Sequence, residues 1–260
     1  MAFEAHPVTK ERWPDLVELF DRPIVRTRFC MFYRKTRTGT GVGLENRQAM
    51  KALVDRGTVP GLIGYENGVP VAWVSIGPRE DYAKLRRSPV MKPVDDRPVW
   101  SIVCFFVDRR ARGRSLSERM LGAAVDFARS CGARLVEAYP VDKDERSHPD
   151  DMFFGAKSMY DRAGFREVAR RRPTRPVLRK VLRPGRSATE PRARGAGPRL
   201  LSGRTAIALG TAPFVSGSVV REPRSRPAAL AAAKIGSCIG TSSSGGAKPM
   251  DGIHPSQGDR

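Results

Sequence analysis

Apolar and polar residues follow two repeating patterns along the first half of the chain, and together these patterns predict a mixed α/β domain. Phe3–Val8 has the composition of a short strand, and a helical period begins at Thr9. Leu44–Arg56 repeats the helical period and is followed by Gly57, a residue type that commonly ends helices. The apolar face of the first helix is formed by Trp13, Leu16, Val17 and Phe20.

The dipeptide Asn67-Gly68 predicts a β-hairpin. It separates two β-prone runs, Leu62–Tyr65 and Val69–Ile76, and Asn-Gly is typical of two-residue turns between antiparallel strands. Pro70 has no backbone N–H to donate to a neighbouring strand, so its place near the start of the second run predicts an edge strand or a bulge.

A continuous apolar run, Trp100–Val107, predicts the central strand of a sheet. It follows a short helix or turn expected at Arg79–Leu85 and a polar, proline-rich surface loop over residues 86–98. Because the run does not alternate apolar with polar residues, we expect both faces of this strand to be covered.

The segments after the central strand alternate between helical and extended patterns. Leu116–Cys131 carries an apolar stripe at helical spacing, and Leu135–Tyr139 has the composition of a strand. Phe154–Ala163 predicts a last helix, and Phe165–Ala169 with Val177–Leu182 predicts a closing strand pair. Residues 1–183 therefore form one mixed α/β domain without an internal repeat.

Composition changes at residue 184. From there to residue 260 the chain is rich in Pro, Gly, Ser, Ala and Arg and has no sustained period. Such a segment cannot bury enough apolar surface to offset the entropy lost on ordering. We therefore expect residues 184–260 to be a disordered, basic tail.

The formal net charge of +20 belongs mostly to the predicted domain. Residues 1–183 carry +13 and residues 184–260 carry +7. This balance suits an anionic ligand, an acidic substrate or nucleic acid, although a solvated basic surface has the same composition. No recognised nucleic-acid-binding motif or set of stacking aromatic residues accompanies the charge, so nucleic acid is the less favoured partner.

The cysteines and histidines show no spacing typical of a metal site, so we predict no metal. The four cysteines have no C-x-x-C pair and sit mostly in apolar or helical contexts, as expected of reduced, buried thiols in a cytoplasmic protein. The N-terminus lacks the pattern of a signal peptide, and no apolar run approaches the length needed to span a membrane.

The segment between the central strand and the following helix has the composition of a phosphate-binding loop. It contains Gly113, which lets the backbone approach a ligand, and the arginines Arg110, Arg112 and Arg114, which add charged donors. Backbone N–H groups at the start of a helix favour an anion. Ser115 and Glu118 have the spacing of a capping box and predict that the helix starts at Ser115.

Two segments in this region resemble the GCN5-related N-acetyltransferase (GNAT) family. Arg110-x-x-Gly113-x-Ser115 is similar to the family's acyl-CoA pyrophosphate loop, Gln/Arg-x-x-Gly-x-Gly/Ala, with Ser115 in place of the last Gly or Ala. The segment from Ala156 to Phe165 is similar to Ala-x-x-x-Tyr-x-x-x-Gly-Phe. The resemblance covers roughly residues 5–183. It implies a mixed, mostly antiparallel central sheet flanked by helices and acetyl transfer from acetyl-CoA to an amine.

The resemblance also implies where acetyl-CoA binds as a cosubstrate. The pantetheine arm would pair with the exposed end of the central strand, where Phe105 and Val107 lie. The pyrophosphate would lie against residues 112–115, with Arg110 and Arg114 adding positive charge. The residues that the resemblance implies in binding of the cosubstrate are therefore Phe105, Val107, Arg110, Arg112, Gly113, Arg114 and Ser115.

For catalysis, the resemblance implies Tyr160 as the general acid that protonates the leaving thiolate. The general base stays open between Glu137, Asp142, His148 and a water relay. The early aromatic residues Phe29, Phe32 and Tyr33, with Met31, would either contact the acceptor or pack the helices onto the sheet.

The acceptor and the assembly state are not determined by the sequence. A small-molecule or peptide amine fits the implied reaction, and a homodimer is possible. Two other functions stay open: a regulatory module that binds acyl-CoA without turnover, and a basic protein associated with nucleic acid.

Overall fold

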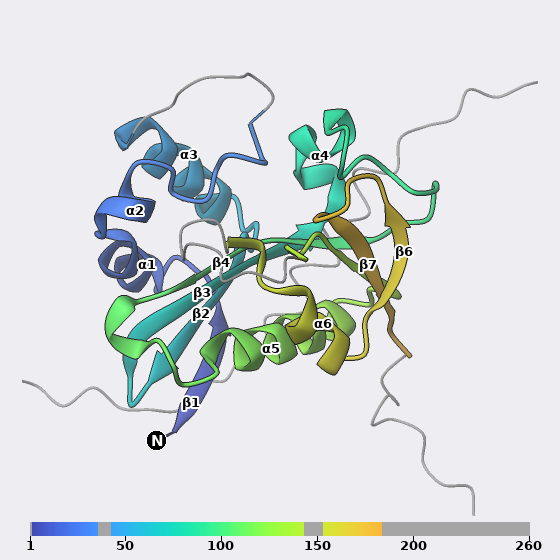
Figure 1. Cartoon of the computed structure of the whole chain (residues 1–260). Helices are drawn as coiled ribbons and strands as arrows, with labels where there is room; N and C mark the ends of the chain where they lie inside the picture. Colours follow the sequence, from blue (N-terminus) through green and yellow to red (C-terminus); the bar gives the residue numbers. More distant parts are fainter. Residues whose placement is uncertain (1, 36–42, 143–152, 184–260) are drawn as a thin grey trace, which may run out of the picture.

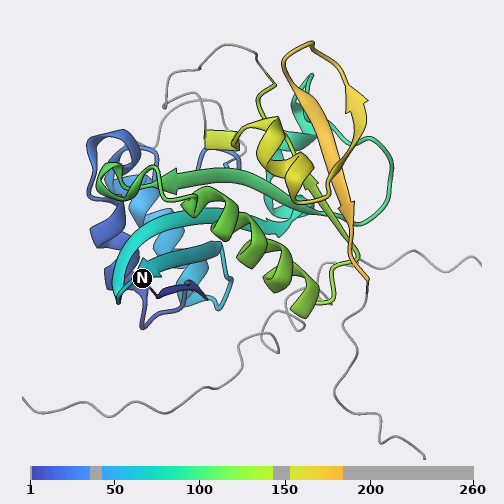
Figure 2. The same cartoon turned by 60° about the horizontal axis from the view of Figure 1, so that its bottom comes forward.

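The computed structural model of the chain describes residues 2–35, 43–142 and 153–183 (Figure 1). The predicted tail, residues 184–260, lies outside this range, as does His148. The described residues form a seven-stranded sheet covered by helices on both faces (Figures 1 and 2). The predicted fold class, a mixed and mostly antiparallel sheet flanked by helices, is confirmed.

The strands follow the order β1-β2-β3-β4-β5-β7-β6 across the sheet. Every neighbouring pair is antiparallel except β4 and β5, which are parallel. The strands are β1 (Phe3–Pro7), β2 (Gly61–Glu66), β3 (Val69–Pro78), β4 (Trp100–Val107), β5 (Leu135–Ala138), β6 (Arg166–Arg170) and β7 (Pro176–Val181).

The helices divide between the two faces of the sheet. The long helix α5 crosses one face with α6 beside it (Figure 2), whereas α1, α2 and α3 cover the other face (Figure 1). The helices are α1 (Trp13–Phe20), α2 (Pro23–Arg26), α3 (Leu44–Asp55), α4 (Ala83–Arg87), α5 (Leu116–Ser130) and α6 (Lys157–Arg162), with the 3-10 turns η1 (Arg79–Asp81) and η2 (Arg109–Ala111).

Alternate side chains of the central strands pack into two separate hydrophobic cores, one on each face of the sheet. In β3, Ala72 and Val74 pack into the core under α5, while Trp73 between them packs under α1 and α3. In β4, Phe105 and Phe106 divide in the same way. In these stretches neighbouring residues face opposite layers, and β4 is covered on both faces, as its uninterrupted apolar run predicts.

Strand β4 changes its surroundings halfway along its length. It pairs with β3 along its full length, but with β5 only at Trp100, Ser101 and Ile102. The β3–β4 register shifts between Ser75 and Ile76, which leaves one extra residue, Val103, in β4 at this point. Beyond Ile102 the β5-facing edge of β4 has no strand partner among the described residues.

Two predicted helices begin later than expected, for local backbone reasons. The first starts at Trp13 rather than Thr9, with Pro14 in its first turn, where a missing N–H costs nothing. The last starts at Lys157 rather than Phe154, because Gly155 has a positive φ of 75° and Ala156 is extended.

Pro70 does not lie on an edge strand, because β3 is paired on both sides. Its second predicted setting is confirmed. The β2–β3 register shifts between Gly64 and Tyr65, and Tyr65 is the residue paired with Pro70.

Candidate functional site

The loop between β4 and α5, residues 108–115, is called the Gly113 loop, and Asp108 holds its start in place. One carboxylate oxygen accepts a hydrogen bond from the backbone N–H of Arg110 at 2.9 Å, and the other accepts one from Arg22 Nε at 3.0 Å. Burial raises the pKa of Asp108, but the hydrogen bonds from Arg110 and Arg22 outweigh burial and hold the pKa below its ordinary value. Asp108 therefore joins the loop to the turn between α1 and α2.

The loop enters α5 through two residues with left-handed backbone. Gly113 has φ of +82°, and Ser115, the residue that caps α5, has φ of +55°. The helix starts at the predicted place, but the expected capping box is wrong, since no side-chain hydrogen bond caps this helix. An N-cap side chain normally reaches the next N–H groups from extended backbone, and Ser115 is not extended. Glu118 instead pairs with Arg162 of α6.

A cavity of about 370 Å³ opens directly in front of this loop. Val107, Arg112, Gly113 and Ser115 form one side of it, and the start of α6 forms the opposite side. A side-chain carbon added to Gly113 would meet nothing within 4 Å. The glycine is therefore needed for its backbone angle, and the space before it is open to a ligand.

Several backbone donors at this cavity have no partner in the described part of the chain. The N–H groups of Gly113, Ser115, Leu116 and Ser117 make no hydrogen bond with described residues. The first N–H groups of any helix lack an intrahelical acceptor, and they carry the positive end of the helix dipole. Together with Arg112, they make the cavity suitable for an anion such as a pyrophosphate.

The predicted arginines do not all face the cavity. Arg112 lines it, and its Nε donates to the Val107 carbonyl at 3.4 Å. Arg114 instead turns toward β2, where it pairs with Glu66 at 2.8 Å and donates to the Arg110 carbonyl at 3.3 Å. Arg114 therefore fixes the shape of the loop, and Arg110 does so through its backbone.

The predicted acid, Tyr160, is fully buried beside the unpaired stretch of β4. Its hydroxyl donates to the carbonyl of Phe154 at 2.8 Å, and its ring packs edge-on against Phe105 with centroids 6.4 Å apart. Burial raises the pKa of Tyr160 well above its ordinary value, and the nearby sulfur of Cys104 adds to the rise. The phenol is thus protonated at neutral pH.

Aromatic and basic residues from distant segments meet next to Tyr160. The ring of Tyr33 packs edge-on against Phe154 with centroids 5.6 Å apart, and the guanidinium of Arg175 lies 4.2 Å from the Phe154 ring centre. Burial raises the pKa of Tyr33 to about 12, whereas burial lowers the pKa of Arg175. Arg175 forms no ion pair with the carboxylates of described residues.

The four aromatic or apolar residues considered for acceptor contact separate into two groups. Phe29 and Met31 are buried in the core under α1 and α3, as the packing alternative predicts. Phe32 is exposed, with the Lys84 ammonium 3.7 Å from its ring centre, and Tyr33 borders the region of Tyr160. Only Tyr33 of this group lies close to Phe154.

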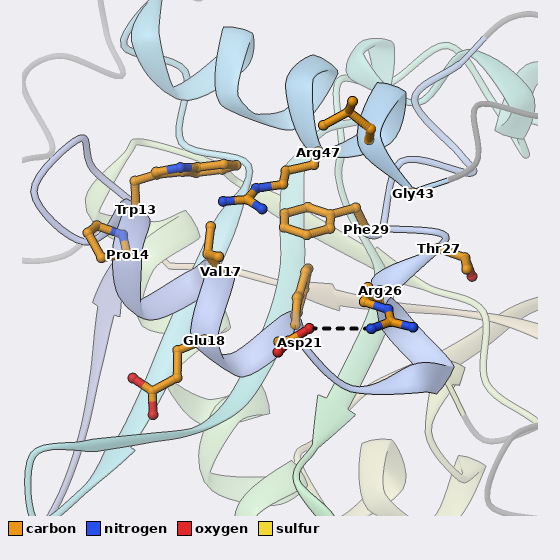
Figure 3. A pocket seen from close by; sticks show the side chains of 12 residues that line it. Trp13, Pro14, Val17, Glu18, Asp21, Arg26, Thr27, Phe29, Gly43 and Arg47 are labelled. Carbon is orange, nitrogen blue, oxygen red and sulfur yellow. Dashed lines mark ion pairs between the residues drawn. The ribbon is translucent and has the colours of Figure 1, made fainter.

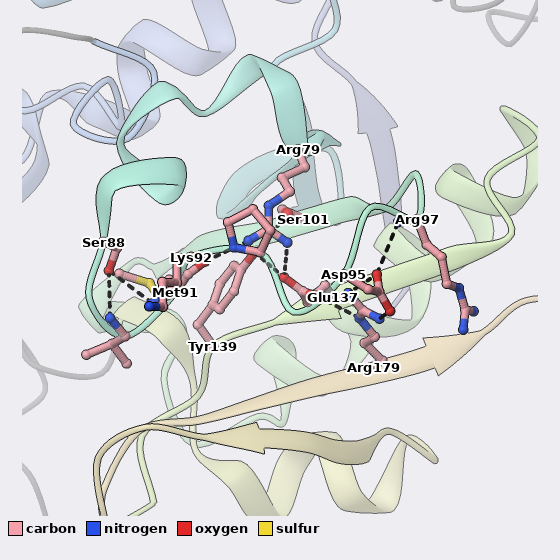
Figure 4. Close-up of polar contacts among 12 residues, drawn as sticks. Arg79, Ser88, Met91, Lys92, Asp95, Arg97, Ser101, Glu137, Tyr139 and Arg179 are labelled. Atoms are coloured by element: carbon pink, nitrogen blue, oxygen red, sulfur yellow. Dashed lines mark hydrogen bonds and ion pairs between the residues drawn. The ribbon is translucent and has the colours of Figure 1, made fainter.

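The candidate base Glu137 lies in a buried ion-pair network rather than in an open cleft (Figure 4). One of its carboxylate oxygens accepts from Arg79 and from the Tyr139 hydroxyl, and the other accepts from Arg179 Nε at 2.7 Å. Arg179 also binds Asp95 through both terminal nitrogens. Both oxygens of Glu137 already accept hydrogen bonds and are shielded from solvent, so neither is available to take a proton from an amine.

Of the other two candidate bases, the structure describes only Asp142, and its carboxylate is already paired. Asp142 pairs with Arg170 at 2.7 Å, and His148 lies outside the described residues. Within the described ranges, no group of three or more histidine, cysteine or acidic residues could hold a metal ion. No helix in those ranges is long and apolar enough to cross a membrane.

A second cavity, of about 750 Å³, lies between α1, α2 and α3 (Figure 3). Its wall combines the aromatic rings of Trp13 and Phe29 with the charged side chains of Asp21, Arg26 and Arg47. Asp21 and Arg26 already face each other at 3.8 Å. The cavity does not include the Gly113 loop, so its larger volume does not make it the candidate site.

Asp108 and Arg22 are the site-forming residues that the sequence did not single out. The position of Asp108, directly between the apolar strand and the basic loop, is a signal that could have identified it. Arg22 lies 86 residues away in the chain, and nothing local to it predicts the contact.

The comparison with protein families finds a match. The model of the acetyltransferase (GNAT) family matches residues 25–165. A comparison with curated proteins finds no match.

Solved structures of similar fold are distant in sequence. An N-acetyltransferase from Staphylococcus aureus Mu50 is 15% identical, with 70% of this chain and 100% of that chain covered and a TM-score of 0.43. A polyamine N-acetyltransferase of Drosophila melanogaster is 13% identical, with 70% and 100% covered and a TM-score of 0.46. A Salmonella typhimurium protein solved with its cofactor acetyl-CoA is 16% identical, with 72% and 98% covered and a TM-score of 0.43.

Proposed function

This chain belongs to the acetyltransferase (GNAT) family, and from that premise we propose that it transfers an acetyl group from acetyl-CoA to a primary amine within a ternary complex. The observation that carries the proposal is the Gly113 loop, where Arg112 and backbone N–H groups without a partner among the described residues line an open cavity of about 370 Å³. The match to the family covers this loop and Tyr160.

The residues at this loop fit the pyrophosphate of CoA. The proposed contacts are the N–H groups of Gly113, Ser115, Leu116 and Ser117 and the guanidinium of Arg112. Both the donors and the positive end of α5 favour an anion, and Gly113 has no side-chain atoms that would stand in its way. Phe105 would contribute apolar packing to the rest of the cosubstrate, and Val107 lines the cavity directly.

The unpaired edge of β4 is the proposed place of the pantetheine arm. An amide-bearing chain can pair with an exposed strand edge as an added strand would. Beyond Ile102 this edge has no strand partner among described residues, and the bulge at Val103 redirects the backbone there. We propose that backbone N–H groups at this bulge stabilise negative charge that develops on the reacting carbonyl oxygen.

Acetyl-CoA supplies the reaction with an activated acyl group, and the protein supplies position and a proton. Tyr160 is the proposed general acid, because its phenol stays protonated at neutral pH and lies beside the unpaired stretch of β4. Its present hydrogen bond to the Phe154 carbonyl would be exchanged when it donates to the leaving thiolate.

For the proton of the amine we propose a water relay. Glu137 is enclosed by Arg79 and Arg179, and Asp142 is paired with Arg170, so neither offers an unoccupied carboxylate. Tyr33, with its pKa raised to about 12 by burial, is a poor base at neutral pH. Because none of these three side chains is suited to accept the proton, a water molecule is the proposed acceptor.

The deciding experiment is calorimetric titration of the full chain with acetyl-CoA, beside the Gly113→Glu variant. We expect saturable binding by the wild type and a loss of at least about 100-fold in the variant, since the new carboxylate would repel the pyrophosphate. Gly68→Glu is the matched control: Gly68 also has a positive φ and open space, but it lies in the β2–β3 turn. Equal affinities in wild type and Gly113→Glu would contradict the proposed site.

A screen of amine acceptors then tests turnover separately from binding. Release of CoA that depends on an added amine would support the acetyl-transfer reaction. Saturable binding without turnover of any amine would favour the regulatory module instead. Binding of RNA or DNA that falls steeply with salt, without acetyl-CoA binding, would favour the third function.

A further inference from the structure

Two cysteines from distant parts of the chain meet beside the candidate site. The sulfur atoms of Cys30 and Cys104 are 3.0 Å apart, although 74 positions separate the residues in the sequence. Cys104 lies in the stretch of β4 that has no β5 partner, and Cys30 lies in the segment between α2 and α3. The sequence predicted unpaired, buried thiols, so this contact depends on the tertiary structure.

The backbone at Cys30 is held in an uncommon conformation. Phe29 and Cys30 both have positive φ, at 45° and 49°, and neither is a glycine. Left-handed backbone at an ordinary residue is strained and persists only where surrounding contacts impose it. Here the buried ring of Phe29 packs against Phe20 with centroids 5.0 Å apart. This anchor fixes the turn that places the Cys30 sulfur against Cys104.

The two thiols also differ from Cys131 in their surroundings. Cys30 and Cys104 are partly accessible, whereas Cys131 is buried in the core under α5. The hydrogen bond that Cys104 shares with Cys30, together with burial, raises the pKa of Cys104. The raised pKa favours the thiol form of Cys104, which is the weaker nucleophile, so Cys30 is the sulfur expected to attack an oxidant first.

We propose that Cys30 and Cys104 are a site of reversible oxidation, at which a hydroperoxide converts the two thiols to an intramolecular disulfide. The Cys30 thiolate attacks one peroxide oxygen, the O–O bond breaks, and an alcohol or water leaves, so that Cys30 becomes a sulfenic acid. The Cys104 sulfur then attacks the Cys30 sulfur and expels water. Two electrons pass from the two thiols to the peroxide, and a dithiol reductant reverses the change.

The fold needs only a small adjustment to make this bond. A disulfide joins its sulfur atoms at about 2.05 Å, so the two atoms would approach by roughly 1 Å from their present separation. The bond would tie the segment after α2 to the unpaired edge of β4. Closing a loop of this length restricts the unfolded chain strongly, so we expect the oxidised protein to be the more stable form.

The test is peptide mapping of the full chain after treatment with hydrogen peroxide, without reduction and with free thiols alkylated. Trypsin separates all four cysteines: Cys30 falls in Phe29–Arg34, Cys104 in Ser88–Arg109, Cys131 in Ser130–Arg134 and Cys238 in Ile235–Arg260. We expect Phe29–Arg34 linked to Ser88–Arg109, with Cys131 still alkylated. Alkylation of both Cys30 and Cys104 under conditions that oxidise the protein elsewhere, or links only to Cys131 or Cys238, would overturn the proposal.

Thermal unfolding provides a second readout that does not depend on the enzymatic function. We expect oxidation to raise Tm by on the order of 10 °C and a dithiol to reverse the rise. Cys30→Ser should abolish the rise, whereas the matched variant Cys131→Ser should keep it. A linked pair that leaves Tm unchanged or lowers it would show that the native arrangement does not accommodate the bond.

Discussion

The two halves of strand β4 handle polar groups in opposite ways. In the first half, where β4 pairs with β5, the buried charges around Glu137 find partners within the fold: Arg79, Arg179 and Tyr139 surround its carboxylate (Figure 4). Beyond the end of the second half, the backbone N–H groups of Gly113, Ser115, Leu116 and Ser117 line a cavity and have no partner in the described part of the chain. A satisfied network makes a fixed frame, and an unsatisfied row of donors makes a place for a ligand.

The difference also explains why a carboxylate near the site is a poor candidate base. Glu137 is one strand away from the unpaired edge of β4, but removing it from water required two arginines to neutralise it. A base needs an oxygen that can take and return a proton. The network holds β4, β5 and β7 in register and thereby positions the place where β4 and β5 part.

The largest expected effect comes from disrupting the buried ion-pair network beside the first half of β4. Glu137→Gln removes the charge that Arg79 and Arg179 share, so we expect a loss of about 3–5 kcal/mol in the free energy of unfolding, measured in urea. The matched control is Glu167→Gln, because Glu167 pairs with Arg170 near the surface and should cost at most about 1 kcal/mol. Equal losses in both variants would mean that the buried network is not the stabilising frame.

Tyr160→Phe tests the second half of β4, where the proposed ligand binds. We expect turnover with an identified acceptor to fall about 100-fold while acetyl-CoA affinity changes little, because the hydroxyl is needed only as a proton donor. Tyr65→Phe, which removes a hydroxyl bound to Asp15 on the other face of the sheet, is the control and should leave turnover unchanged. An unchanged rate in Tyr160→Phe would remove this residue from the mechanism.

Asp108→Asn tests the link between the loop and the rest of the fold. We expect a loss of about 1–2 kcal/mol at neutral pH, since the charge that binds Arg22 disappears while an amide oxygen can still accept from the Arg110 N–H. The pKa of Asp108 is lowered in the folded protein, so its contribution is complete above the unfolded value of about 4 and is lost as pH falls through the folded value.

The difference between wild type and Asp108→Asn should therefore shrink as the pH is lowered below about 4, measured by urea unfolding at each pH. A difference that stays constant down to the lowest pH at which the wild type is folded would assign the effect to packing rather than to charge.

The smallest expected effect concerns backbone strain at the loop. Ser115→Gly places a glycine at φ of +55°, and we expect a gain of roughly 0.5–1 kcal/mol in the free energy of unfolding. Gly113→Ala, at φ of +82° with open space around it, should instead cost about 1 kcal/mol. Destabilisation by Ser115→Gly would show that the serine side chain makes a contact that offsets its strain.

Patterns that depend on neighbouring residues were predicted well. The Asn67-Gly68 turn, the central strand Trp100–Val107 and the helix after Ser115 all lie where the sequence places them. Their signals are local, since a turn, an apolar run and a helical stripe each follow from a few consecutive side chains. The late start of α6 at Lys157 shows the limit, because the positive φ of Gly155 is set by the packing of the loop.

By itself the sequence predicted the seven strands and the helices other than α2 in their order along the chain, the position of the Gly113 loop and the presence of Tyr160 after it. Only the tertiary structure decided which charged groups are neutralised and which surfaces stay open. It paired Glu137 with Arg79 and Arg179, joined Asp108 to Arg22 and brought Cys30 within 3.0 Å of Cys104. The physical reason is that burial and electrostatic pairing depend on contacts between residues tens of positions apart, which no local pattern encodes.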